Sequence, residues 1–286
     1  MGADMSTLSS LISGGGGDTL PTIPITASTT FTPPFNGTAV IHCIGAGGSG
    51  GSDANTGNVS GGGAGGYCRK AVTLSTGTNW TMVVGVGGAG VDSSTNGNAG
   101  GNTTASDGSS SLVANGGGAG LTNSTAAVAG GSASGGDVNN TGGAGGHNGS
   151  MCGGGAVGVL STGDAGEMGG IGNTLNNRQY GGHSDVQSPQ FQNTNGLLFG
   201  GGRGGRFYND FGYGSTNNGS NINGGFLAGG GAAAITLDTR AVMGGDGGIG
   251  GGGGTANTAS STTTEGYLAS GEGGNGLIIV MYTALT

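Results

Sequence analysis

The stretch TAVIHCIGAGGSGG at residues 38–51 decides the fold, and GGGAGGYCRKAVTL at residues 61–74 has the same two parts in the opposite order. Each joins a run of apolar and β-branched residues to a tract of glycine, alanine and serine. Apolar runs of this kind, bounded by glycine, are typical of β-strands. The tracts carry too little side chain to form an apolar core. We therefore expect short strands to alternate with extended glycine segments.

The strand-like runs can be placed along the chain by composition. The clearest are predicted at Ala39–Ile44, Tyr67–Leu74, Trp80–Val86 and Gly276–Tyr282, with a shorter one at Thr29–Phe31. The segment Ser75–Asn79 is interpreted as a hairpin connection between two of them. No stretch has the i, i+3, i+4, i+7 spacing of an amphipathic helix, so we expect essentially no α-helix.

Glycine accounts for 78 of the 286 residues, about 27 per cent, against roughly 7 per cent in average proteins. An extended helix with three residues per turn makes no internal hydrogen bonds, so its N–H and C=O groups point outward. Neighbouring rods of this kind can pair through their main chains if no side chain separates them. The predicted class is therefore all-β/irregular, with short antiparallel strands and a stacked polyglycine II helix sandwich. Disordered glycine linkers between strands are the alternative.

The chain is divided at a change in composition. Residues 1–37 hold four of the five prolines and are predicted to form an extended N-terminal arm, which serves as an attachment segment. Residues 38–286 are predicted to form the glycine-rich domain. Within it we expect a strand-rich part at 38–115, polyglycine helices with long loops at 116–275, and a closing strand at 276–286.

Charge and hydropathy exclude several classes of partner. Only 6 basic and 14 acidic residues are present, which argues against binding to nucleic-acid phosphates. No apolar run approaches the roughly 20 residues needed to span a bilayer, so membrane insertion is not expected. The N-terminus lacks a basic region before its apolar residues and is not expected to be a signal peptide.

No pattern points to a cofactor, a metal or catalysis, and we do not expect an enzyme. Gly45, Gly47 and Gly50 match a dinucleotide-binding fingerprint, but the required helix cannot follow them. The glycine run at 244–254 lacks the tandem spacing of a calcium repeat. The remaining metal-binding side chains are scattered: Cys43, Cys68 and Cys152, expected to be reduced and packed, and His42, His147 and His183, of which His42 is expected on a strand face.

Aromatic and arginine side chains gather in one part of the chain. Eight of its 14 aromatic residues fall between positions 180 and 226, among asparagine, serine and glycine. Rigid rings with small polar neighbours are typical of binding loops, and tyrosine and arginine are enriched at binding hot spots. The predicted receptor-binding residues are Arg178, Tyr180, Phe191, Arg203, Arg206, Phe207, Tyr208, Phe211, Tyr213 and Phe226. The alternative is that these rings cap the glycine rods and form a small local core.

The order of motifs resembles a known family. TFTPPFNGTAVIHCIGAGGSGG from Thr30 is followed by GGGAGGYCRKAVTLSTGTNWTMVVGVGGAG and then by GNTTASDGSSSLVANGGGAG, and GEGGNGLIIVMYT closes the chain. This order is similar to the glycine-rich domain of tail-fibre and receptor-binding proteins of tailed bacteriophages. More loosely, the chain resembles the distal tail-fibre adhesins of T-even-type phages, whose glycine tracts stack as polyglycine II helices.

The resemblance implies a virion protein at the tip of a tail fibre, assembled in the host cytoplasm. Its implied partners are a bacterial outer-surface receptor, protein or glycan, other tail-fibre proteins, and further copies of the chain in a homo-oligomer. A purely structural fibre or capsid-decorating protein is the first alternative. An ice-binding protein is a more remote one, and it would require a regular G-x-x period that the sequence lacks.

Overall fold

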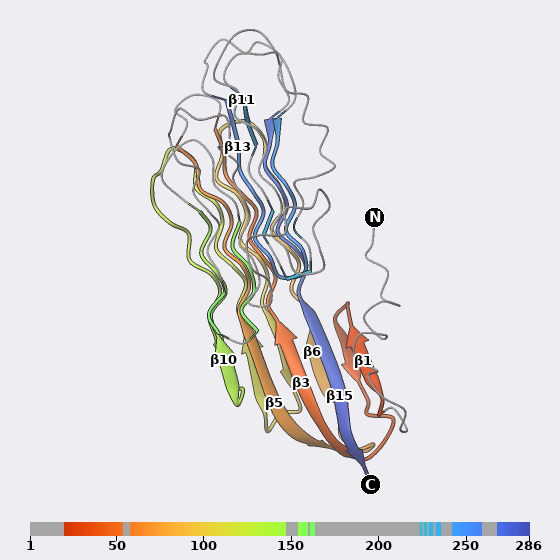
Figure 1. The fold of residues 1–286 in the computed structure, drawn as a ribbon. Coiled ribbons are helices and arrows are strands. Elements are labelled where there is room, and N and C mark those ends of the chain that lie inside the picture. The colour runs from red at the N-terminus through yellow and green to blue at the C-terminus, as the bar shows by residue number, and fades with distance from the viewer. Residues whose placement is uncertain are drawn as a thin grey trace.

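The computed structural model describes residues 20–53, 58–146, 154–159, 161–163, 224, 226–227, 229–230, 233–235, 242–258 and 268–286. These residues form two parts, a sandwich of two β-sheets and a bundle of extended glycine-rich rods that continues from it (Figure 1). Within the described residues there is no helix, and none therefore that is long and apolar enough to cross a membrane. The predicted fold class is confirmed.

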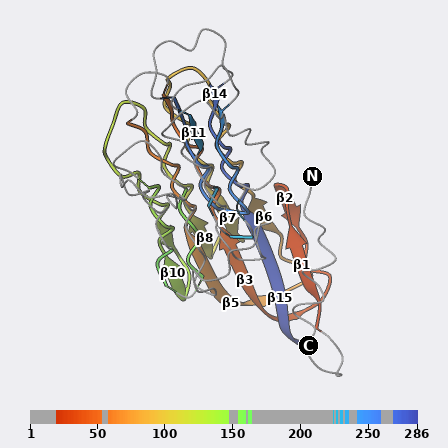
Figure 2. The same ribbon diagram turned by 45° about the horizontal axis from the view of Figure 1, so that its top comes forward.

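Each sheet of the sandwich has five strands. The first, called here the β3 sheet, has the order β1-β15-β3-β5-β10, and the second, the β6 sheet, has the order β2-β6-β7-β8-β9; all their pairs are antiparallel (Figure 2). The β3 sheet comprises β1 (Thr22–Ile25), β15 (Leu277–Leu285), β3 (Gly37–Ile44), β5 (Tyr67–Leu74) and β10 (Val138–Asn140). The β6 sheet comprises β2 (Thr29–Phe31), β6 (Trp80–Val83), β7 (Thr103–Ser106), β8 (Ser111–Ala114) and β9 (Ala133–Ser134).

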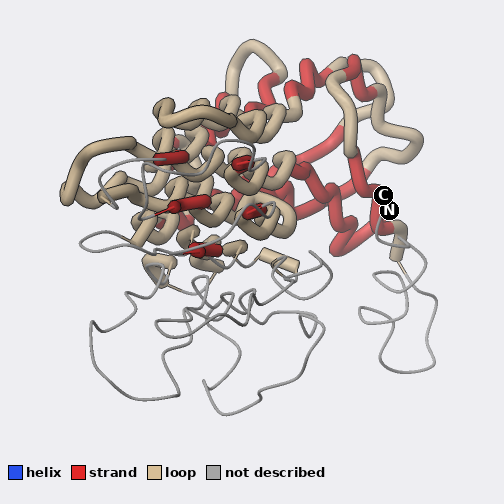
Figure 3. Tube along the Cα trace, turned by 90° about the horizontal axis from the view of Figure 1, so that it is seen from above, coloured by secondary structure: helices blue, strands red, loops and turns tan. Residues whose placement is uncertain are grey.

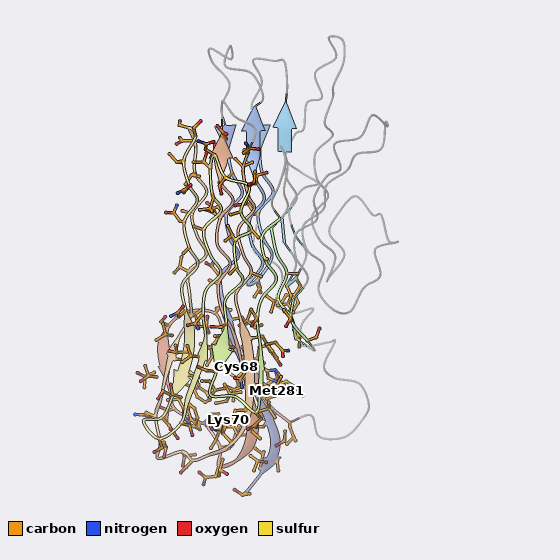
Figure 4. The ribbon with its side chains drawn as sticks, turned by 90° about the vertical axis from the view of Figure 1, so that its left-hand side faces the viewer. Cys68, Lys70 and Met281 are labelled. Atoms are coloured by element: carbon orange, nitrogen blue, oxygen red, sulfur yellow. The ribbon has the colours of Figure 1, made fainter. Side chains whose placement is uncertain are left out.

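The space between the two sheets holds the main apolar core. Alternate residues of each strand face inward, as in β3, where Ala39, Ile41 and Cys43 are all at most 1% exposed. Trp80 of β6 and Leu112 of β8 meet them from the other sheet. Figure 4 shows the same division in the side chains, which crowd the two sheets and are sparse along the rods. Apolar burial stabilises the sandwich in the ordinary way.

The predicted hairpin at Ser75–Asn79 is wrong. The segment does turn, with the N–H of Thr78 donating to the carbonyl of Ser75 at 3.0 Å, but β5 and β6 belong to different sheets. The chain crosses from one sheet to the other there, and it does so also between β1 and β2, between β2 and β3, and between β9 and β10. Because β5 and β6 are adjacent in sequence, we predicted that they pair side by side. In the structure they lie in two sheets that pack face to face, and their inward side chains meet in the core between those sheets.

Part of the segment predicted as an N-terminal arm is built into the sandwich. β1 pairs with β15, and β2 forms at the predicted residues Thr29–Phe31 and pairs with β6. Residues 1–19 lie outside the described residues. The division of the chain at residue 37 and the role of the arm in attachment stay predictions.

The rods are the second part of the molecule, and rod 45–52 shows how they are held. Its eight consecutive N–H groups donate to carbonyls of other rods at 2.8 to 3.2 Å. Every third residue addresses the same neighbour: residues 45, 48 and 51 donate to rod 58–66, residues 46, 49 and 52 to rod 95–101, and residues 47 and 50 to rod 271–274. This is the period of a three-residue helix without internal hydrogen bonds.

The carbonyls of rod 45–52 bond to three further rods, so that six neighbours surround it. They accept N–H groups from Gly88, from Gly117 and Gly120, and from Gly253 and Ala256. Rods 58–66 and 250–256 are enclosed in the same way, and all three interior rods are buried throughout their described glycine residues. Figure 3 looks down on the rods nearly end-on and shows them gathered in one bundle.

The interior rods have glycine where a neighbour's main chain comes closest. A Cβ atom built on Gly47 would overlap the carbonyl of Gly251, and one on Gly62 would overlap the carbonyl of Gly48. Small side chains are accommodated at the other positions, as at Ala46 and Ser49, both 0% exposed. Main-chain contact thus replaces side-chain packing in this half of the molecule.

Asparagine side chains take the place of missing neighbours at the outer rods. Their amide groups bond to main-chain N–H or C=O groups, joining Asn96 to Thr122, Asn98 to Ala89, Asn102 to Gly116 and Asn275 to Gly87 at 2.8 to 2.9 Å. A buried or half-buried main-chain group needs such a partner. Asparagine is suited to this role because one side chain offers both a donor and an acceptor.

Short parallel strands lie where the rods end away from the sandwich. β13 (Ala256–Thr258) pairs with β4 (Ser52–Asp53) on one side and β11 (Ala233–Ile235) on the other, and β12 (Val242–Met243) pairs with β14 (Leu268–Ala269). Successive rods run in opposite directions, so these strands come from rods that run the same way.

Candidate functional site

Nearly all the predicted receptor-binding residues lie outside the described residues. These are Arg178, Tyr180, Phe191, Arg203, Arg206, Phe207, Tyr208, Phe211 and Tyr213. Phe226 is described, and it is half-buried against the apolar cluster at the base of the rods. Its place agrees with the alternative in which a ring caps the rods, while its role in binding stays a prediction.

The described residues on either side of segment 164–223 are attached to the rods. The N–H of Gly163 donates to the carbonyl of Thr141 at 2.9 Å, and the N–H of Gly224 donates to the carbonyl of Asp246 at 2.7 Å. Farther on, the carbonyl of Leu227 accepts the N–H of Val157 at 2.9 Å. Both ends of the aromatic- and arginine-rich segment are therefore fixed to the same bundle.

A second apolar cluster supports this attachment. It lies on the outer face of the β3 sheet, where Ile44, Tyr67 and Leu277 meet Val157 and Leu227. All five side chains are at most 4% exposed. The rods that flank segment 164–223 are thus anchored by side-chain packing at their base as well as by main-chain bonds above it.

One polar pair stands next to this cluster. His42 Nδ1 and the Tyr67 hydroxyl are 2.8 Å apart, and Arg69 lies opposite His42 in the register of β3 and β5. Burial, with Arg69 as a second cause, lowers the pKa of His42 to about 4. Burial raises the pKa of Tyr67 to about 12. Both groups are neutral at pH 7, so neither is poised to transfer a proton there.

We expect His42 to make the protein sensitive to acid. Its pKa is 6.5 when unfolded and about 4 when folded, so the unfolded state binds the extra proton first as pH falls. The free energy of unfolding should therefore drop between pH 6.5 and 4 by roughly 2–3 kcal/mol, and this contribution should level off below pH 4. Urea unfolding across this range measures it.

His42→Gln is the matched variant, because it keeps an acceptor for the Tyr67 hydroxyl and does not titrate. The difference in stability between the variant and the parent should grow in favour of the variant between pH 6.5 and 4. His147→Gln serves as the control. Parallel pH curves for the parent and His42→Gln would contradict this account.

The structure also places the other residues singled out by sequence. His42 lies on a face of β3 as predicted, whereas His147 and His183 lie outside the described residues. Cys43 and Cys68 are free and buried as predicted, and Cys152 is not among the described residues. In the described part of the chain, no three histidine, cysteine, aspartate or glutamate side chains are grouped as metal ligands. The fingerprint glycines Gly45, Gly47 and Gly50 belong to an interior rod.

The pairing of His42 with Tyr67 and the asparagine contacts of the outer rods were missed by sequence reasoning. The alternation of β3 contained a signal for the first, because His42 shares its outward face with Ile44. The second had no such signal, since the asparagines stand at irregular intervals. Both depend on which segments become neighbours in the fold.

Comparison with known proteins identifies the family of this chain. No curated protein matches the chain. A family model described as a glycine-rich domain matches residues 24–283, which spans the described rods and both sheets except the outer ends of β1 and β15. This chain belongs to that glycine-rich domain family.

Proposed function

We propose that this protein is the adhesin at the tip of a bacteriophage tail fibre and that it binds a receptor on the bacterial surface. The observation that carries the proposal is the attachment of segment 164–223 at both ends to a bundle of rods held by main-chain bonds. That segment holds seven of the chain's 14 aromatic residues, among asparagine, serine and glycine. Composition of this kind is typical of binding loops.

Rigidity of the scaffold supports the proposal on physical grounds. Binding costs less conformational entropy when the segments that carry the contact residues start and end at fixed points. Six-neighbour packing of the interior rods supplies such points without a large side-chain core. The order of strands and glycine tracts, similar to that of phage receptor-binding proteins, is the second support. The receptor is a protein or glycan, and the chain's other partners are tail-fibre proteins and further copies of itself.

Purified protein is expected to block adsorption of the phage that carries it. The double variant Tyr208→Ala/Tyr213→Ala should lose this block by at least about tenfold, since aromatic hot-spot residues each contribute roughly 2 kcal/mol or more. Adsorption assays with increasing protein concentration measure the loss. Unfolding curves should stay unchanged.

Tyr267→Ala is the matched control, because Tyr267 lies outside segment 164–223. Full blocking by the double variant would place the binding site elsewhere. Antibody labelling of intact particles separates the alternative function: label at a fibre tip supports an adhesin, whereas label along a shaft or on the head supports a structural component.

A further inference from the structure

Cys43 and Cys68 face each other across neighbouring strands. They are register partners in the antiparallel pair β3–β5, and both side chains are 0% exposed in the core between the sheets. Partners in such a pair have Cα atoms about 4.5–5.5 Å apart, within the roughly 4.4–6.8 Å that a disulfide spans. Figure 4 places Cys68 in the sandwich, toward the rods.

The two thiols are already in contact. The thiol of Cys43 donates a hydrogen bond to the sulfur of Cys68, and this bond raises the pKa of Cys43 and lowers that of Cys68. The sulfur of Cys68 also accepts the main-chain N–H of Val113 from the facing sheet. Two donors thus point at one sulfur in the folded protein, so the two thiols are already placed for a bond between them. A thiolate is the form that attacks a disulfide.

The two cysteines stand at the two ends of a glycine-rich segment of the chain. Between Cys43 and Cys68 the chain forms rods 45–52 and 58–66, two of the three interior rods. A bond between the cysteines would close a loop around this glycine-rich segment. Glycine has more conformational freedom in the unfolded chain than any other residue, so closing this loop restricts the unfolded state strongly.

We infer that Cys43 and Cys68 are an oxidation site, at which a soluble disulfide converts the two thiols into a cross-strand disulfide at the base of the interior rods. The Cys68 thiolate attacks one sulfur of the oxidant and releases one thiolate. The Cys43 thiolate then attacks the Cys68 sulfur of the mixed disulfide and releases the second. The protein loses two protons and two electrons, and the oxidant takes them up to become two thiols. This inference does not depend on receptor binding.

The pair reacts when β5 is open, because neither sulfur is accessible in the folded protein. Oxidation therefore accompanies folding, or a local opening that separates β5 from β8 of the facing sheet, whose Val113 contacts the Cys68 sulfur. A cell interior keeps the thiols reduced, and the extracellular medium allows the bond. The rods would thus gain their covalent closure outside the cell.

The test uses full-length Cys152→Ser protein, refolded from denaturant in a buffer of oxidised and reduced glutathione. Peptide mass mapping should find one intramolecular bond between Cys43 and Cys68, with both thiols lost to alkylation. The oxidised protein should melt about 5–10 °C above its reduced form. The variant Cys43→Ala/Cys152→Ser should yield only a glutathione adduct at Cys68.

Three results would overturn the inference. The first is that the Cys43 and Cys68 thiols still react with the alkylating reagent after refolding. The second is that disulfides form between two chains and not within one. The third is that the oxidised form melts no higher than the reduced form. Mass mapping of the protein without substitutions repeats the assay should the variants fold poorly, because it identifies the partners of all three cysteines directly.

Discussion

Gly62→Ala is expected to destabilise the folded protein by about 3 kcal/mol or more. Gly62 lies in interior rod 58–66, where its N–H donates to Gly253 at 2.9 Å and its carbonyl accepts from Gly155 at 3.0 Å. A Cβ atom there would overlap main-chain atoms of Gly48 and Ser49. Main chain cannot rotate away as a side chain does, so the rods must separate and lose hydrogen bonds. Unfolding in guanidinium chloride measures the loss.

Substitutions at two other glycines separate the steric cost of a Cβ atom from the cost of backbone conformation. A Cβ on Gly77 would have no neighbour closer than 4.0 Å, so Gly77→Ala should be neutral or stabilising by up to about 1 kcal/mol. Gly108 also has open space but a φ of +87°, so Gly108→Ala should cost roughly 1–2 kcal/mol for conformation alone. Gly62 has no such φ, and its cost is steric.

The ranking of the three variants by their loss of stability distinguishes packed rods from loose linkers. Packed rods require Gly62→Ala to be the most damaging. Equal effects of Gly62→Ala and Gly77→Ala would mean that no main chain lies against Gly62. In that case the stacked polyglycine helices would be absent and the glycine tracts would be connections between strands.

The strands could be predicted from the sequence because their signals are local. Tyr67–Leu74 was predicted with the bounds observed for β5, and Trp80–Val86 was too long only because Val84–Val86 continue into a rod. The pairing of the strands, by contrast, depends on residues far apart in the sequence. β5 and β6 are neighbours in sequence, yet they belong to opposite sheets and bury their inward faces in the same core, and nothing in the sequence of Ser75–Asn79 predicts that the chain changes sheet there.

The rods could be predicted as a type but not as an arrangement. The abundance of glycine and the lack of charge indicated main-chain packing. In rod 45–52 the three-residue period also appears in the residue types, because its non-glycine residues Ala46, Ser49 and Ser52 all face rod 95–101, but nothing in these residue types says which rods become neighbours. Ala46 and Ser49 occur where a small side chain fits, and Gly47 where only hydrogen fits. The predicted binding residues followed from composition alone, and segment 164–223 has no strand-like alternation from which their positions could be derived.

The amides of the interior rods are expected to exchange with solvent more slowly than free glycine amides by roughly four to seven orders of magnitude. Every N–H from residue 45 to 52 and from 60 to 66 donates to a carbonyl of another rod. Successive donors address three different neighbours, so no rod can open toward one side and keep its other bonds. Exchange there should require unfolding of the whole bundle. Hydrogen–deuterium exchange followed by mass spectrometry or NMR measures it.

Exposed turns supply the internal reference for the same experiment. The N–H of Gly77 bonds at 3.4 Å to the hydroxyl of Ser75 two residues away, and that of Gly108 bonds to Ser106 in a similar turn, so both should exchange quickly. Rod amides that exchange as fast as Gly77 would show that the glycine segments are linkers. The fixed ends proposed for segment 164–223 would then be lost, because Gly163 and Gly224 are held only as firmly as the rods that carry Thr141 and Asp246. Slow exchange, by contrast, would show that the main-chain bonds of the rods hold the ends of the binding segment as fixed points, as the proposal requires.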